Sequence, residues 1–192
     1  PAKARGLKAR IRATVQSGVH PFKKYNKYTF TDPTKRFQSQ SMIVFEDRLD
    51  DNGETEIDPE FGITKGAPGF LRVAFHSEVY EKSGNFSTDN KFFSLSPFKH
   101  YAGLKINDGK LEYGTLVTGE DHQVQLVSLN DKGKPSGNRK LEVKVYKMDW
   151  SWWWERNRNL TNYVSANNLL PHMEKTVTTD SKGKGVFKLR IN

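Results

Sequence analysis

Alternation of apolar and polar residues in short stretches is the feature that most constrains the fold of this chain. In residues 7–15, 71–75 and 187–191 every second side chain is apolar, and mostly Arg, Lys or Thr stands between them. A period of two residues predicts β-strands with one buried face. No stretch shows a convincing period of 3.6 residues, although residues 159–167 could form one helical turn. Short strands separated by turn signals, without intervening helices, predict an antiparallel β-sandwich.

The amino-acid composition limits the size of the core and the classes of site. The chain has 192 residues, which suit one large or two small domains, and 35% are hydrophobic, so the cores must be thin. The sequence has no cysteine, which excludes disulfides, thiol catalysis and cysteine metal sites. No apolar run approaches the ~20 residues that span a bilayer, so we expect no direct membrane insertion by this segment.

The net charge of +9 would allow binding to polyanions. The basic residues are, however, spread along the chain, with short clusters at residues 3–12 and 132–144. No nucleic-acid-binding motif accompanies them. We therefore favour a solvated basic face and expect no nucleic-acid partner.

A predicted strand at residues 141–145 continues into a segment rich in tryptophan. Up to Val145 the apolar residues occupy odd positions, whereas from Tyr146 to Trp154 the large residues mainly occupy even positions. A change of phase without a turn residue predicts a β-bulge, because one extra residue moves every later side chain to the other face. We therefore expect one long, bent strand, with Val143 and Val145 facing a core.

The tryptophans of this segment form the candidate functional site of the chain: Trp150, Trp152, Trp153 and Trp154. Trp152 and Trp153 are adjacent, so in a regular strand they face opposite ways and at least one lies off the core. Aromatic side chains of this size favour packing in the core or against a neighbouring domain. Stacking on a sugar ring is the alternative, and the chain would then be an extracellular carbohydrate-binding or adhesin-type module.

An internal repeat accounts for most of the strand signals. A strand beginning near Leu7 aligns with one beginning near Leu141, and a later hairpin turn at Gly53 aligns with one at Gly183. Each copy contains a strand, a variable insert and a hairpin closed by an Asp-x-Gly or Asp-x-x-Gly turn. The order of these features predicts two copies of one β-sandwich module.

The module boundary is predicted at Pro97, because proline breaks strand pairing. The two domains are then residues 1–97 and residues 98–192. The second copy has strand signals ahead of its first aligned strand and the first copy has almost none, so we expect the first domain to be N-terminally incomplete. By the same comparison we expect the second domain to be C-terminally incomplete, and both to expose sheet edges that recruit other chains.

Several stretches of the chain resemble the bacterial alpha-2-macroglobulin family. In the second copy they are Tyr101-Ala-Gly-Leu-Lys-Ile, the strand and tryptophan-rich segment from Gly133 to Glu155, and Asn162-Tyr-Val-Ser. In the first copy they are Pro1 to Lys8 and Tyr28-Thr-Phe-Thr-Asp. The resemblance covers most of the chain and is more specific over residues 101–165 than over residues 1–99.

This resemblance implies tandem macroglobulin domains, which are seven-stranded, antiparallel, immunoglobulin-like β-sandwiches. In that family they form the scaffold of large exported inhibitors, in which a protease cuts a bait segment and a Cys-x-Glu-Gln thioester captures the attacker. Since this chain has no cysteine and no low-complexity bait segment, it would supply scaffold only and would not be an enzyme. The implied partners are neighbouring macroglobulin domains and, through the parent chain, target proteases. The implied location is the periplasm or the cell surface, in a lipoprotein parent.

No other residues form a convincing site for catalysis, a cofactor or a metal. Five histidines are widely separated, without metal-ligand spacing: His20, His76, His100, His122 and His172. Five acidic residues surround the Asn52-Gly53 turn: Asp47, Asp50, Asp51, Glu54 and Glu56. Their spacing misses the EF-hand pattern, so we expect a solvated hairpin tip. A role as the accessory domain of a hydrolase would need an active site elsewhere in the parent.

Overall fold

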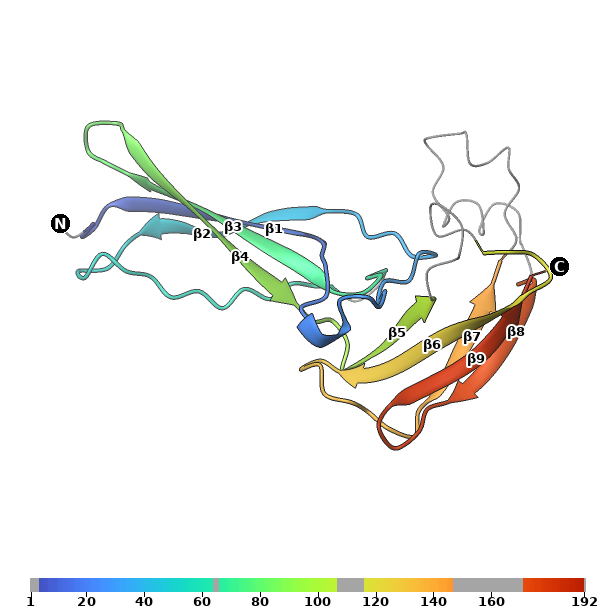
Figure 1. The fold of residues 1–192 in the computed structure, drawn as a ribbon. Helices are drawn as coiled ribbons and strands as arrows, with labels where there is room; N and C mark the ends of the chain where they lie inside the picture. Colours follow the sequence, from blue (N-terminus) through green and yellow to red (C-terminus); the bar gives the residue numbers. More distant parts are fainter. Residues whose placement is uncertain (1–3, 64–65, 107–115, 147–170, 192) are drawn as a thin grey trace, which may run out of the picture. The chain divides into compact units, whose positions relative to one another are not determined.

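The computed structural model describes residues 4–63, 66–106, 116–146 and 171–191, which form an all-β protein (Figure 1). The strands are β1 (Lys8–Ser17), β2 (Gln40–Arg48), β3 (Leu71–Tyr80), β4 (Phe86–Leu95), β5 (His100–Ile106), β6 (Asp121–Asn130), β7 (Lys140–Val145), β8 (Met173–Thr178) and β9 (Lys184–Arg190). Within the described residues, the one helical element is a 3-10 turn, η1, at Lys23–Tyr25. The predicted all-β, antiparallel class is confirmed. Among the same residues, no helix is long and apolar enough to cross a membrane.

The chain folds into two compact units, and the chain crosses between them more than once. The first unit contains residues 1–19 and 36–97, and the second contains residues 20–35 and 98–192. The boundary expected at Pro97 stays a prediction for the domains of the parent. Residues 20–35 precede that boundary in the sequence but pack with the second unit.

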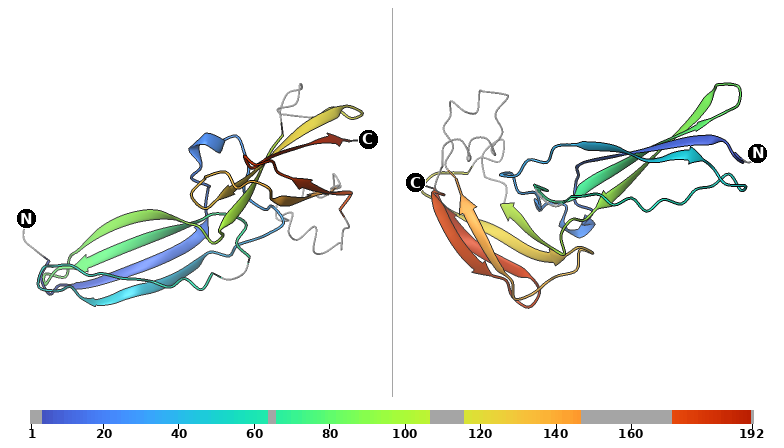
Figure 2. Two further views of the ribbon diagram at one scale, coloured as in Figure 1. Left: turned by 90° about the horizontal axis from the view of Figure 1, so that it is seen from below. Right: turned by 180° about the vertical axis from the view of Figure 1, so that it is seen from behind.

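The first unit is a four-stranded antiparallel sheet in the order β2-β1-β3-β4 (Figure 2). The alternating residues of β1 and β3 meet on one face, where Val15 lies opposite Val73 and Ala13 lies opposite Phe75. Ala13, Val15 and Val73 are at most 2% exposed. The connection between β2 and β3 covers them, since Ala67 belongs to the same buried cluster.

Strand β4 is an exposed edge of this sheet. Nine of its ten residues are exposed, and three of these are phenylalanines. Cζ of the Arg72 guanidinium lies over the ring of Phe92, 4.0 Å from the centroid of that ring. The ring centroids of Phe93 and Phe75 are 5.7 Å apart. These contacts leave more than half of Phe92 and Phe93 exposed, so this edge presents apolar surface for a partner.

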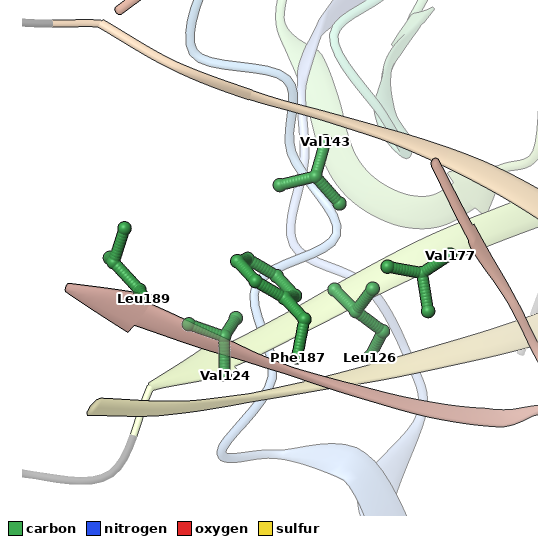
Figure 3. Packing of buried hydrophobic residues seen from close by; sticks show 6 residues of the cluster. All are labelled: Val124, Leu126, Val143, Val177, Phe187 and Leu189. Atoms are coloured by element: carbon green, nitrogen blue, oxygen red, sulfur yellow. The ribbon is translucent and has the colours of Figure 1, made fainter. Parts of the chain in front are cut away.

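The second unit is a sandwich of two sheets, β5-β6-β9 and β7-β8. Its core side chains point into the space between the sheets (Figure 3): Val124, Leu126, Val143, Val177, Phe187 and Leu189. Val143 is 8% exposed, and Val145 packs against the same cluster, so the prediction that both face a core is confirmed. Strand β7 ends at Val145, and the expected bulge with the tryptophan segment lies outside the described residues.

Two phenylalanines of residues 20–35 pack into spaces that glycines leave in the second unit. A Cβ atom on Gly103 would lie 2.5 Å from Cε1 of Phe30, and one on Gly133 would lie 2.7 Å from Cδ1 of Phe22. Phe22 and Phe30 are each 6% exposed, and their rings meet at 5.1 Å. Reciprocal backbone hydrogen bonds of 2.8 and 2.9 Å join Thr29 to Leu104 on β5. Residues 20–35 are therefore a structural part of the second unit.

The internal repeat is present in the structure, with one correction to its alignment. In the first unit the N–H of Leu49 donates to the C=O of Leu7, and in the second the N–H of Thr179 donates to the C=O of Arg139, both at 2.9 Å. Leu7 thus corresponds to Arg139, and not to Leu141 as the sequence alignment has it.

Two residues just ahead of the aligned strands support this correction. Gly6 and Asn138 both adopt positive φ angles, +63° and +55°, and their N–H groups donate to the C=O groups of Asp50 and Asp180. Moving the alignment from Leu141 to Arg139 keeps every side chain on its predicted face, because the period of a strand is two. Strand β1 therefore corresponds to β7, and β2 corresponds to β8.

Candidate functional site

The four tryptophans singled out by the sequence, at positions 150, 152, 153 and 154, lie outside the described residues. Their expected role in packing, and the alternative of glycan contact, stay predictions. The structure brings a different set of residues together, along the opening between the two sheets of the second unit.

Three of the histidines lie beside oxygen atoms of nearby residues and hold local structure. Nε2 of His20 lies 3.1 Å from the C=O of Tyr28, and Nε2 of His122 lies 2.7 Å from the C=O of Val117. Nδ1 of His76 lies 2.9 Å from Oδ1 of Asn90 on the neighbouring strand. Within the part of the chain that the structure describes, no three His, Asp or Glu side chains could hold a metal ion together.

The acidic cluster near Gly53 stabilises a turn. Oδ1 of Asp50 accepts hydrogen bonds from the N–H groups of Asn52 at 2.9 Å and Glu54 at 2.7 Å, and Asp51 pairs with Arg5 at 2.9 Å. Gly53 has a φ of +79°, a conformation that glycine adopts without strain. These carboxylates serve the hairpin tip that the sequence predicts.

Charged side chains on the outer face of the first unit join its strands. Nη2 of Arg10 on β1 donates to Oε1 of Glu46 on β2 at 2.6 Å, and this hydrogen bond lowers the pKa of Glu46 and raises the pKa of Arg10. On β3 the hydroxyl of Tyr80 donates to Oε2 of Glu78 at 2.6 Å, which lowers the pKa of Glu78. One hydrogen bond joins β1 to β2 and the other lies within β3, and both favour the charged carboxylate, as expected of structural contacts rather than of general acids.

A cavity of about 660 Å³ lies in the second unit, with residues of strands β5 and β7 among its lining. We call it the interlayer groove. Its residues come from the strands and from the segment 32–34: Asp32, Pro33, Thr34, Ala102, Gly103, Leu104, Ile106, Val124, Leu126, Leu141, Glu142, Val143, Lys144, Val145, Tyr146, Phe187 and Leu189. Most of them are apolar, and several are the core residues of Figure 3. Among the described residues, this side of the sandwich leaves core side chains bordering the groove.

The wall formed by β7 combines both faces of that strand. Leu141, Val143 and Val145 are inner residues, whereas Glu142 and Lys144 belong to the outer face. Because consecutive residues of β7 line the groove, the backbone edge of the strand borders it.

At the outer rim of this wall, Lys144 lies between two carboxylates. Nζ of Lys144 lies 3.2 Å from Oε1 of Glu142 and 3.2 Å from Oε1 of Glu174 on β8. Hydrogen bonds to Glu174 and Glu142 raise the pKa of Lys144. With Lys140 on the same face of β7, two lysines and two glutamates lie on the outer face of these two strands.

Neither this groove nor the phenylalanine contacts of residues 20–35 is predicted by the sequence. Gly103 offered a signal, because an isolated glycine within a strand pattern often marks a close approach by another group. The groove had no comparable signal, since it depends on which edges of the two sheets remain unpaired.

One family model matches part of the chain. The family model described as "Bacterial macroglobulin domain 6" matches residues 103–192. No curated protein matches the chain significantly.

The whole chain is similar in fold to parts of larger solved structures. Trypsin-activated alpha-2-macroglobulin from Escherichia coli matches with a TM-score of 0.66 and 16% identity over 100% of this chain and 13% of that one. The native conformation of Escherichia coli alpha-2-macroglobulin matches with a TM-score of 0.63 and 15% identity, over 100% and 13% of the two chains. Salmonella alpha-2-macroglobulin reacted with methylamine matches with a TM-score of 0.62 and 14% identity, over the same shares. Identities this low establish a shared fold alone, and the chain spans 13% of the length of these proteins.

Proposed function

We propose that this chain is a non-catalytic scaffold segment of a larger bacterial protease inhibitor of the macroglobulin family, since the model of bacterial macroglobulin domain 6 matches residues 103–192. The family match over residues 103–192 is the observation that carries this proposal. The fold shared with alpha-2-macroglobulins over the whole chain supports it for the first unit as well.

The physical character of the chain agrees with a structural role. Its charged groups pair across strands or cap turns, and its apolar residues build two sheet cores. The chain has no cysteine, so a thioester of the parent would lie outside it. In this proposal, the parent traps proteases through bait and thioester segments elsewhere, while these units set the distance and orientation of those segments.

The partners follow from the same proposal. Neighbouring macroglobulin domains would contact the exposed apolar surfaces, such as the β4 edge with Phe92 and Phe93. Target proteases would meet the parent rather than this segment. The parent would be exported to the periplasm or the cell surface.

We assign the tryptophans at positions 150–154 to packing against a neighbouring domain of the parent. A glycan array on the chain, with tryptophan fluorescence as the readout of binding, tests the carbohydrate alternative. Saturable quenching by one glycan class would reject the packing assignment and favour a carbohydrate-binding module.

The scaffold proposal is tested in the intact parent protein. Phe187→Ala removes a core side chain that is 5% exposed, and Lys188→Ala removes an exposed neighbour on the same strand. We expect Phe187→Ala to lower the temperature above which protease capture is lost, because capture depends on a folded scaffold, and Lys188→Ala to leave it unchanged. Capture that tolerates complete unfolding of this segment would reject a scaffold role.

A further inference from the structure

Another cavity of the second unit, of about 450 Å³, is formed by η1 and the turn that follows β6. We call it the lysine pocket. Its lining residues are Pro21, Phe22, Lys23, Lys24, Tyr25, Asp131, Lys132, Gly133 and Lys134. Its volume falls within the range of about 300–1,000 Å³ that is typical of sites for small molecules. Four lysines and one aspartate therefore surround a space that suits a small ligand.

The lysine pocket lies at the end of the second unit where β6 ends and where β5 and β7 begin. The last residue of β6, Asn130, pairs with the first residue of β5, His100. The N–H of Ser136, just ahead of β7, donates to the C=O of Ser128 on β6 at 2.8 Å. The strand ends that lead into residues 107–115 and 147–170 are at the opposite end of the unit, and all the residues that line the pocket are described.

The backbone that carries these lysines is held in place by local contacts. Oδ1 of Asn130 accepts hydrogen bonds from the N–H groups of Lys132 at 3.0 Å and Lys134 at 2.9 Å. The ring of Phe22 packs against Gly133, where a Cβ atom would lie 2.7 Å from Cδ1 of the ring. This contact joins the segment with the first two lysines to the turn with the other two, so the pocket is formed before any ligand binds.

The lysines of the pocket lack the carboxylate partners that other lysines of the second unit have. Nζ of Lys144 lies 3.2 Å from a carboxylate oxygen, and Nζ of Lys188 lies 3.5 Å from one. Within the described ranges, no ion pair joins Asp131 or another carboxylate to the four pocket lysines. Since salt screens charges only over about 8 Å under physiological conditions, positive charges around so small a cavity repel one another and act together on an anion. A bound anion would relieve this repulsion.

We propose that the lysine pocket binds phosphate in a compact, multiply charged form. The ammonium group of lysine is a point charge that suits phosphate oxygens, whereas planar carboxylates favour the forked guanidinium of arginine, and no lining residue is arginine. A single negative charge would leave most of the four lysines without a counter-charge, so an anion with several charges is favoured. Two sources share this chemistry, a soluble polyphosphate and the phosphorylated headgroup of a lipid.

The turn at residues 180–184 is a matched control for the turn at residues 130–134. Both contain Lys-Gly-Lys, their glycines have φ angles of +72° and +73°, and in both a side-chain oxygen of the first residue accepts from the two lysine N–H groups. The lysines of the control turn are exposed and do not line the pocket. The pocket variant is Lys132→Gln with Lys134→Gln, and the control variant is Lys182→Gln with Lys184→Gln.

Inorganic pyrophosphate is the probe, titrated into the full chain by calorimetry at low salt. We expect saturable binding that the pocket variant weakens about tenfold, because two charge pairs each contribute a severalfold factor, and that the control variant changes by less than about twofold. Asp131→Asn should tighten binding, because it removes the one carboxylate of the lining. This side chain is exposed and makes no hydrogen bond to a described residue, so its replacement tests the pocket without disturbing the fold.

Sedimentation with vesicles separates the two sources of phosphate. Binding of pyrophosphate without binding to phosphatidic acid vesicles identifies a soluble ligand. Binding to phosphatidic acid vesicles, absent with phosphatidylcholine vesicles and lost in the pocket variant, identifies a lipid headgroup.

Three results would overturn the proposal. The first is no saturable binding of pyrophosphate, and the second is equal weakening by the pocket and control variants or no tightening by Asp131→Asn. The third is tighter binding of a short polyglutamate peptide than of pyrophosphate in the same titration, which would identify an acidic polypeptide as the partner of the pocket.

Discussion

The contact between Gly103 and Phe30 gives a sharp test of how residues 20–35 join the second unit. In Gly103→Ala the new Cβ would lie 2.5 Å from Cε1 of Phe30 and 2.9 Å from Cγ1 of Val127. Overpacking of a core costs about 1–3 kcal/mol, and replacing a strand glycine by alanine returns about 0.5–1 kcal/mol of chain entropy. We therefore expect Gly103→Ala to lower the free energy of unfolding by about 1–2 kcal/mol.

The double variant separates this contact from general damage to the strand. Phe30→Ala alone should cost about 3–5 kcal/mol, because Phe30 is 6% exposed. Once the ring is absent, most of the penalty of Gly103→Ala should disappear, with Val127 accounting for the remainder. The predicted coupling energy between the two positions is about 1–2 kcal/mol, within the range for residues in contact.

Urea unfolding of the full chain, followed by circular dichroism, measures all four corners of this cycle. Gly62→Ala is the control, because Gly62 has an ordinary φ angle and no atom within 4 Å of a new Cβ. It should not lower the free energy of unfolding, and should raise it by about 0.4–1 kcal/mol, because alanine reduces the entropy of the unfolded chain. Equal costs of Gly103→Ala with and without Phe30 would refute the packing of residues 20–35 described above.

Three further predictions follow from the same structure. Val143→Ala should destabilise the chain by about 1.5–2 kcal/mol because two buried methyl groups are lost, with little added cavity cost since Val143 already borders the groove. Denaturant unfolding should show a cost of less than about 0.5 kcal/mol for the exposed control, Lys144→Ala. Because the pKa of Glu46 is lowered in the folded state, the Glu46 carboxylate stabilises the fold fully above the ordinary glutamate pKa of 4.5 and loses this effect as the pH falls through the folded pKa. The free energy of unfolding should therefore fall below about pH 4.5, and Glu46→Gln should make that fall shallower. The edges of β4 and β7, which pair with no further strand among the described residues, should produce concentration-dependent association in sedimentation runs, and a strict monomer at high concentration would argue against open edges.

The parts of the fold that depend on local pattern could be predicted from the sequence. Period-two alternation located β1, β3 and β9 and the buried faces of Val15, Val73 and Leu189, because a half-buried strand shows this pattern within a few residues. Turn chemistry located Gly53 and Gly183, both with positive φ angles. The same turn also occurs at Gly133, outside the repeat, so turn residues alone align the two copies poorly.

The parts that depend on long-range packing could not be predicted. Phe22 and Phe30 stand among Lys, Tyr and Asn residues without a period, so nothing local assigns them to the second unit. The correct alignment of the two copies required the hydrogen bonds of Leu7 and Arg139, since a strand with a period of two aligns equally well when moved by two residues. The interlayer groove follows from sheet order, which no single segment encodes.

A protease-capture assay tests the central claim, that this chain is scaffold and that the reactive segments of its parent lie elsewhere. Trypsin is mixed in equimolar amounts with the isolated chain and, separately, with the intact parent, and both residual activity and SDS-stable adducts are measured. The account predicts full trypsin activity and no adduct with the isolated chain, and capture by the parent. Inhibition or a covalent adduct with the isolated chain, or a parent that leaves trypsin free, would contradict it.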